Sequence, residues 1–289
     1  MKRILMLFAL VLLTFTSANA QPSDWQQVEK IFGKKGNVQH DMIKITFPRS
    51  DLTVKMDDVT IEPGLAFSTW IGFRKMGAQA VMMGDMVLLE GEVAPVMAKL
   101  VAEKIKITAL HNHLIKTKPA VMYLHFSGAG NAEKLAGIMV SALSLTKTPM
   151  GSSEPAVSPE TPADWSKVEA VFGKKGQVKG KVLQMSFPRR EKIRERGMEV
   201  PAYLGEATAI NFQMAGDKVA AAGDFVLVAN EVNLVITTLI EHGIAVTAVH
   251  NHMLFESPRL FFLHFWGYDA PEKVAEGLKA ALDKTNVAK

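Results

Sequence analysis

The chain has 289 residues, of which 48% are hydrophobic and 21% are charged, so it can bury a substantial core, and its length suggests about two domains. It contains no cysteine, which excludes disulfides, thiolate metal sites and a lipidated N-terminal cysteine. The formal net charge is +4, from 33 basic and 29 acidic residues. This near-neutral balance predicts that nucleic acid is not a partner.

The first 20 residues have the pattern of a signal peptide. Lys2 and Arg3 precede an apolar run over 4–16, and Ala18-Asn19-Ala20 supplies the small residues of a cleavage site. The run is shorter than the roughly 20 residues that cross a bilayer, so we expect no stable membrane insertion after cleavage. The mature protein is expected to be periplasmic or secreted; an uncleaved anchor is the alternative.

The rest of the chain is a tandem duplication. "DWQQVEKIFGKKGNV" from Asp24 returns as "DWSKVEAVFGKKGQV" from Asp164, and "GDMVLLEGEV" from Gly84 returns as "GDFVLVANEV" from Gly223. We predict repeat domain 1 over 21–146 and repeat domain 2 over 164–289. A Pro/Ser-rich linker over 147–163 joins them, and the two folded repeats can dock as a pseudo-dimer.

Each repeat begins with a short helix that ends at the glycine of "FG", followed by an extended stretch to "ITFPR" or "MSFPR". Two more strands precede an amphipathic helix, expected over 93–105 and 232–242. "KITALHNH" and "AVMYLHF" then predict a hairpin, and a helix ends the repeat. The order strand, helix, strand, strand, helix implies an α+β fold. We expect two tandem α/β sandwiches, each an antiparallel or mixed sheet with helices on one face, ferredoxin-like or permuted.

The histidines are the most informative feature. Six of the eight lie in "TALHNHLIKTKPAVMYLHF" and "TAVHNHMLFESPRLFFLHF", at identical internal spacing. Residues two apart on a strand project from one face. If His250 faces Phe262 in the hairpin, His264 faces Ala248 on the same face, with the Cβ atoms of the two histidines about 6–7 Å apart.

Three neutral imidazoles at this spacing can share one metal ion and leave a position open. We therefore predict one divalent-metal site in each repeat, with zinc as the first candidate cofactor. The predicted ligands are His111, His113 and His125 in repeat 1, and His250, His252 and His264 in repeat 2.

Two other interpretations of the histidines remain open. The same strand face carries Val246 and Ala248, so the histidines could be half-buried structural residues that hydrogen bonds satisfy. Retention of all three in two diverged copies favours ligation. Alternatively, the two copies imitate a homodimer and the histidines lie at their mutual interface.

Carboxylates could complete the sites. Asp85 and Asp224 recur after glycine and are weaker candidates for a fourth ligand, although aspartates are also common in turns. Glu256, beside the histidines of repeat 2, is a candidate general base, but repeat 1 has Thr117 there. If only one repeat is chemically competent, it is therefore repeat 2. Whether the protein is an enzyme stays open; a metal-bound water would give hydrolysis or a lyase-like step.

The basic residues that recur support a different function. The pairs Lys34-Lys35 and Lys174-Lys175 return at equivalent positions, as do Arg49 and Arg189. They could hold an anionic cell-envelope polymer in a non-catalytic binding module with structural histidines. Such residues also decorate solvated turns.

The stretch "TAVHNHMLFESPRLFFLHFWG", together with "GDFVLVANEV" upstream, closely resembles the signature of the LppY/LpqO family of bacterial envelope proteins. The resemblance covers both copies, and copy 1 departs from it at Lys116, Thr117 and Lys118. It implies an envelope location and a domain of unknown function, and it supplies no reaction.

Overall fold

The computed structural model describes residues 25–151 and 163–288. The expected signal peptide and most of the expected linker lie outside these ranges. Repeat 1 consists, in chain order, of α1 (Gln26–Phe32), β1 (Asn37–Gln39), β2 (Met42–Pro48), β3 (Val54–Met56), β4 (Val59–Ile61), α2 (Pro63–Ala66), β5 (Ser68–Met76), β6 (Gln79–Leu89), α3 (Glu90–Ala102), β7 (Lys106–His111), β8 (Val121–Gly130) and α4 (Ala132–Leu143).

Repeat 2 has nearly the same succession of elements. It consists of α5 (Ser166–Phe172), β9 (Gln177–Lys179), β10 (Val182–Pro188), β11 (Arg194–Glu195), β12 (Met198–Glu199), the 3-10 helix η1 (Ala202–Leu204), β13 (Ala207–Ala215), β14 (Lys218–Leu227), α6 (Ala229–Glu241), β15 (Ala245–His250), β16 (Glu256–Ser257), β17 (Phe261–Asp269) and α7 (Pro271–Leu282).

Each repeat contains one six-stranded sheet, ordered β1-β2-β5-β6-β8-β7 in repeat 1 and β9-β10-β13-β14-β17-β15 in repeat 2. Neighbouring strands are antiparallel. Because β8 lies between β6 and β7, the unit β6-α3-β7 is the split β-α-β of ferredoxin-like folds. Strand β5 pairs with β6 from the other side but precedes it in the chain. The predicted α+β fold is confirmed, in its permuted form.

Strand β8 illustrates why these sequences form a sheet that is buried on both faces. Leu124 and Phe126 belong to the core between the sheet and its helices. Tyr123 belongs to another core on the opposite face, as the period of two along a strand requires. His125 shares that opposite face and is also buried.

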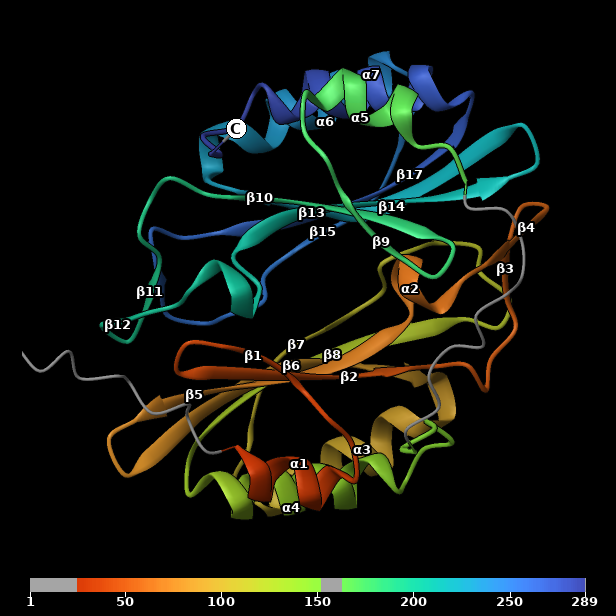
Figure 1. Cartoon of the computed structure of the whole chain (residues 1–289). Helices are drawn as coiled ribbons and strands as arrows, with labels where there is room; N and C mark the ends of the chain where they lie inside the picture. The colour runs from red at the N-terminus through yellow and green to blue at the C-terminus, as the bar shows by residue number, and fades with distance from the viewer. Residues whose placement is uncertain (1–24, 152–162, 289) are drawn as a thin grey trace, which may run out of the picture.

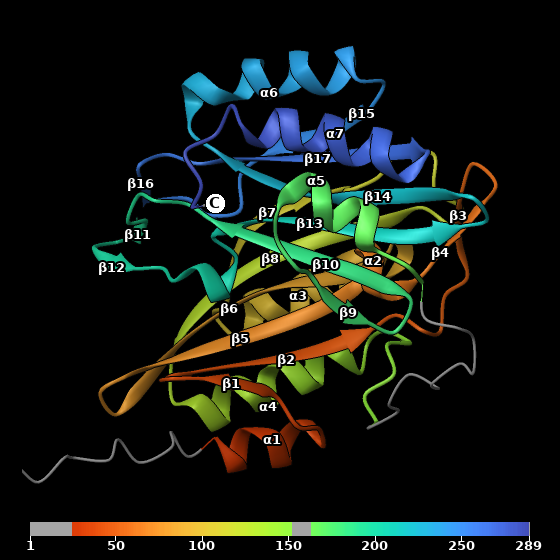
Figure 2. The same ribbon diagram turned by 45° about the horizontal axis from the view of Figure 1, so that its top comes forward.

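The two repeats pack sheet against sheet. In Figures 1 and 2, the sheets occupy the middle of the molecule, with α1, α3 and α4 outside one and α5, α6 and α7 outside the other. Residues of both repeats form the shared core, among them Tyr123 and Trp266. The Gln213 amide also bridges them, since its Oε1 accepts from Glu62 N and its Nε2 donates to Thr60 O, both at 2.8 Å. The result is a four-layer body of helices, sheet, sheet and helices.

Helices α3 and α6 begin three residues earlier than the sequence pattern predicted. The reason is a carboxylate inside each first turn: Glu92 accepts a hydrogen bond from Leu89 N at 2.8 Å, and Glu231 accepts one from Val228 N at 2.9 Å. These bonds satisfy backbone groups that a helix start leaves unpaired. Over the two described ranges, no helix combines the length and apolar composition needed to cross a bilayer.

Candidate metal centre

The histidine hairpins have the register that their spacing predicted. His250 pairs with Phe262, and Ala248 with His264; in repeat 1, His111 pairs with Tyr123, and Ala109 with His125. Each hairpin contains a one-residue irregularity just before this pairing. In repeat 2 the extra residue is Thr247, whose hydroxyl donates to the backbone oxygen of His113 in the other repeat. The irregularity therefore ties the two hairpins together.

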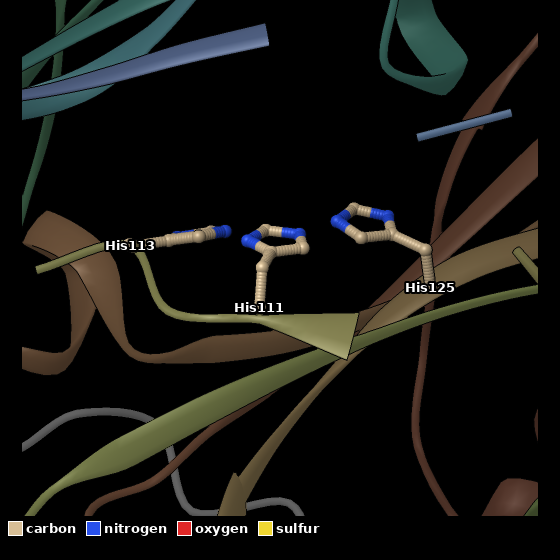
Figure 3. Close-up of side chains that lie close together, drawn as sticks. All are labelled: His111, His113 and His125. Atoms are coloured by element: carbon tan, nitrogen blue, oxygen red, sulfur yellow. The ribbon is translucent and has the colours of Figure 1, made fainter. Parts of the chain in front are cut away.

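The three imidazoles of each repeat form a nearly flat layer. Figure 3 shows the rings of His111, His113 and His125 side by side above the sheet of repeat 1. The ring of His111 is inclined by 23° to that of His113 and by 10° to that of His125, with centroids 5.2 and 5.0 Å away. We call these three residues triad 1.

Triad 2, formed by His250, His252 and His264, repeats this arrangement. The ring centroid of His250 lies 5.0 Å from that of His252 and 4.8 Å from that of His264, with interplanar angles of 31° and 13°. The same strand positions in the two repeats therefore build two matching layers.

The triads stack on each other between the two sheets. The ring centroids are 3.5 Å apart for His111–His250, 3.7 Å for His113–His264 and 3.8 Å for His125–His252. Every stacked pair joins one histidine of each repeat. The sets that the sequence assigned to separate repeats thus lie in one six-histidine cluster.

The protonation of these rings follows from their hydrogen bonds. The Nδ1 atoms of His111, His250 and His264 lie 3.2, 3.1 and 2.8 Å from backbone carbonyl oxygens. Since a carbonyl only accepts, Nδ1 carries the proton and Nε2 keeps its lone pair. All six Nε2 atoms are buried and have no hydrogen-bond partner among the described residues. An imidazole held at one nitrogen by a carbonyl is typical of a metal ligand at the other.

Asp85 and Asp224 lie beside the triads. Asp85 pairs with His125 across β6 and β8, and Asp224 with His264 across β14 and β17. Asp85 Oδ2 is 3.6 Å from His113 Nε2 and 3.7 Å from His125 Nε2. Asp224 Oδ2 is 3.5 Å from His252 Nε2, and Asp224 Oδ1 is 3.9 Å from His264 Nε2.

These carboxylate–imidazole distances are too long for hydrogen bonds. They are close to the separation of two ligands on one tetrahedral ion, which is about 3.4 Å when each metal–ligand bond is about 2.0–2.1 Å. Among the described residues, three sets of three ligand atoms lie within 4.8 Å of one another: triad 1, the set of Asp224, His252 and His264, and a set that joins the repeats, His111, His250 and His252. The donor atoms therefore suit a divalent metal.

Burial sets the charge of the centre. It lowers the pKa of His111 to about 4 and that of His250 to about 3, and it holds the pKa values of the other four histidines well below their ordinary value. Burial also raises the pKa of Asp85 to about 8 and that of Asp224 well above its ordinary value. Neutral imidazoles are the form that binds metals.

Glu256 lies in β16, and both its carboxylate oxygens have partners. Oε1 accepts from Leu260 N at 3.1 Å, and Oε2 accepts from the Arg259 guanidinium at 3.2 Å. These contacts hold the loop between β15 and β17. Its role as a general base stays a prediction.

The repeated arginines have a structural partner that the sequence interpretation missed. Arg49 Nη1 binds Glu92 at 2.8 Å and its Nη2 binds Asp51 at 2.9 Å. Arg189 makes the equivalent pairs with Glu231 at 2.7 Å and with Glu191 at 2.9 Å. Both guanidinium groups are buried, so they present no surface to a polymer. Recurrence of an arginine and a helix-start glutamate in both copies was the signal for this network.

The exposed lysines also have acidic neighbours. Lys35 lies 2.7 Å from Glu29, and Lys175 lies 2.6 Å from Glu169. Each pair closes the turn after the first helix of its repeat. The pattern "FGKKG" thus recurs together with a local ion pair.

Sequence reasoning also missed Glu206. A cavity of about 40 Å³ opens beside the cluster; we call it the access pocket, and its lining includes His125, His252, Glu206 and Glu195. Glu206 is buried, and its Oε2 has no partner in the described part of the chain. Burial raises its pKa to about 8. Because repeat 1 has Phe67 at the equivalent place, repetition gave no signal for this residue.

Comparisons with known proteins give a family but no activity. The model of a family described as "Domain of Unknown Function (DUF1259)" matches residues 26–145 and again residues 166–284. The comparison with curated proteins found no match. A crystal structure of a trimeric bacterial microcompartment shell protein, PduB, aligns over 85% of this chain and 87% of that chain, at 11% identity and a TM-score of 0.20. An overlap this weak says nothing about function.

Proposed function

The chain belongs to the family described as Domain of Unknown Function (DUF1259), with two copies of its domain, and we propose that it binds divalent metal ions in a centre shared by the two repeats. Triad 1 with Asp85 holds one ion, and triad 2 with Asp224 holds the other. Zinc is the first candidate, because three imidazoles and a carboxylate suit its tetrahedral preference.

One observation carries this proposal. Six imidazole Nε2 atoms, together with one oxygen each of Asp85 and Asp224, lack hydrogen-bond partners within the described residues and are buried in one place. Leaving a buried polar atom unsatisfied costs about 1–3 kcal/mol. For eight such atoms in one cluster these costs add up, and a bound ligand that accepts their lone pairs would remove them. Metal ions are the ligands that need lone pairs and donate no protons.

The stacking of the triads supports a pair of ions rather than two distant ones. Stacked rings lie 3.5–3.8 Å apart, and ions held in the planes of the triads would be separated by a similar distance. Two-metal sites have separations of about 3.5–4 Å. A water bound in such a centre would support hydrolysis or a lyase-like step.

We also propose that the protein acts in the periplasm or after secretion, as a relative of the LppY/LpqO proteins. The signal-peptide pattern over residues 1–20 and the histidine signature support this location. The rival function, binding of an anionic envelope polymer, loses support because Arg49 and Arg189 are buried in ion pairs. We therefore favour metal binding.

Elemental analysis of the mature, untagged protein tests the proposal. After incubation with Zn²⁺ and dialysis we expect two zinc ions per chain. A variant in which His252 and His264 are both alanine should keep at most one ion. Protein that carries no zinc above its buffer after this treatment would overturn the proposal.

A further inference from the structure

The access pocket reaches both triads at a single point. It is lined by His125 of triad 1 and His252 of triad 2, and these two rings form one of the stacked pairs, 3.8 Å apart. Elsewhere the cluster is largely covered: His125 and His264 are buried, Tyr123 and Phe262 cover the rings of His113 and His252, and the other histidines are half-buried. This pocket therefore gives an incoming ion a route that leads to a ligand of each repeat.

Acidic side chains line this route on the repeat 2 side. Glu206 and Glu195 line the access pocket, and burial, with a smaller contribution from the charge of Glu256, raises the pKa values of both. Arg259 neutralises Glu256, whereas Glu206 Oε2 has no donor among the described residues. Since burying a carboxylate without a counter-charge costs free energy, a bound cation would stabilise the ionised form of Glu206.

The equivalent place in repeat 1 has apolar residues instead of acidic ones. Phe67 lies immediately before β5, and Glu206 lies immediately before β13. Two residues further on, the hydroxyls of Thr69 and Thr208 each accept a hydrogen bond from a backbone N–H of the neighbouring strand, which confirms that the two positions are equivalent. Phe67 and Met56, which stands where repeat 2 has Glu195, are both buried in the shared core. The acidic lining is therefore a property of one side of the pseudo-dimer.

From this geometry we propose that the access pocket is the loading site of the metal centre. The Glu206 carboxylate binds an incoming divalent cation and passes it to His125 and His252. A divalent cation displaces the proton of a carboxyl group as it binds, so Glu206 can hold the ion in the narrow pocket before the triads take it. This inference rests on the proposed function, because it assumes that the triads are the destination.

Stopped-flow loading of the metal-free, untagged mature protein with Co²⁺, followed by visible absorption, tests the loading site. We expect Glu206→Gln to load at least 10-fold more slowly than the wild type. Its final Co²⁺ content and its spectrum should be those of the wild type, because the triads are unchanged. The matched control is Glu276→Gln, which makes the same substitution on the exposed side of α7 and should load at the wild-type rate.

Glu195→Gln provides a second arm, because Glu195 is less buried and its replacement perturbs folding less. It should slow loading several-fold. Wild-type loading rates in either variant would overturn the loading site, and so would lost Co²⁺ capacity in Glu206→Gln, which would make Glu206 a permanent ligand. Failure of the wild type itself to bind Co²⁺ would instead contradict the proposed metal centre.

Discussion

His111 and His250 stack across the boundary between the repeats, with ring centroids 3.5 Å apart and planes inclined by 23°. Each ring thus forms part of the other's surroundings, and each also lies at the middle of its own triad. A substitution at either position should therefore change the metal affinity of both triads.

Replacement of His250 by alanine tests this coupling. It removes one ligand of triad 2 and the ring that covers His111, so we expect lower affinity for zinc in both triads. Loss of a mere ligand-orienting partner costs roughly 10–100-fold in affinity, and loss of a ligand should cost at least as much. Competition with a chromophoric chelator measures the affinity. The control is His242→Ala, at the exposed end of α6, which should bind zinc like the wild type.

Removal of the metal should destabilise the whole fold. Zinc that binds only the folded state stabilises it by about 2.7 kcal/mol when its free concentration is 100 times Kd. Because the ligands come from both sheets, we expect a single melting transition, and a chelator should lower its temperature. Calorimetry measures this change. Two separate transitions, of which only one moves, would contradict a shared centre.

The buried arginine network should be essential for stability. Arg189→Met leaves the carboxylates of Glu231 and Glu191 without their buried counter-charge, and breaking a buried ion pair from one side costs about 3–5 kcal/mol. Urea denaturation measures the free energy of unfolding. Lys175→Met removes one partner of an exposed pair and should change that free energy by less than about 1 kcal/mol.

Gly223 should tolerate no side chain. A Cβ atom there would lie 2.0 Å from the backbone oxygen of Ala209, so β13 and β14 would have to separate. The carbonyl of Gly223 also holds Nδ1 of His264, and Gly223→Ala should thus lower both stability and zinc affinity. Gly137→Ala in α4, where nothing lies within 4 Å of the added atom, should be neutral or stabilising by up to about 1 kcal/mol. Thermal melts with and without zinc compare the two variants.

Glu206 should give the metal-free protein a specific pH dependence. Its pKa is raised by burial to about 8 from an ordinary 4.5, so the folded state binds more protons than the unfolded state between these values. The free energy of unfolding then falls as the pH rises from about 4.5 to about 8, by a few kcal/mol at most. In Glu206→Gln this fall should be smaller. Urea titrations at several pH values in the presence of a chelator measure the difference, and identical slopes for variant and wild type would contradict it.

The sequence was sufficient for the local geometry of the candidate site. Strand periodicity and the spacing of His250, His252 and His264 placed His250 opposite Phe262, and the hairpin has this register. Repetition identified both copies and the α+β order of elements. These predictions depend on interactions between residues that are near in sequence, for which pattern and propensity are good guides.

The docking of the repeats could not be derived in the same way. It depends on contacts such as those of Gln213 with Glu62 and Thr60, which join residues far apart in sequence and leave no periodic pattern. The stacking of the triads follows from that docking. Glu206 was missed for a related reason, because its importance comes from a pocket between the repeats. The starts of α3 and α6 were misplaced because a side-chain bond, rather than hydrophobic periodicity, fixes them.

Joining the two copies in one chain also changes what substitutions can do. In an assembly of two identical subunits, a glutamate at the position of Glu206 would appear twice, and so would its cost in stability. Here repeat 1 keeps Phe67 to complete the core while repeat 2 carries the acid. Fusion has therefore allowed the two repeats to diverge: repeat 1 contributes apolar packing beside the cluster, and repeat 2 contributes the acidic lining of the access pocket.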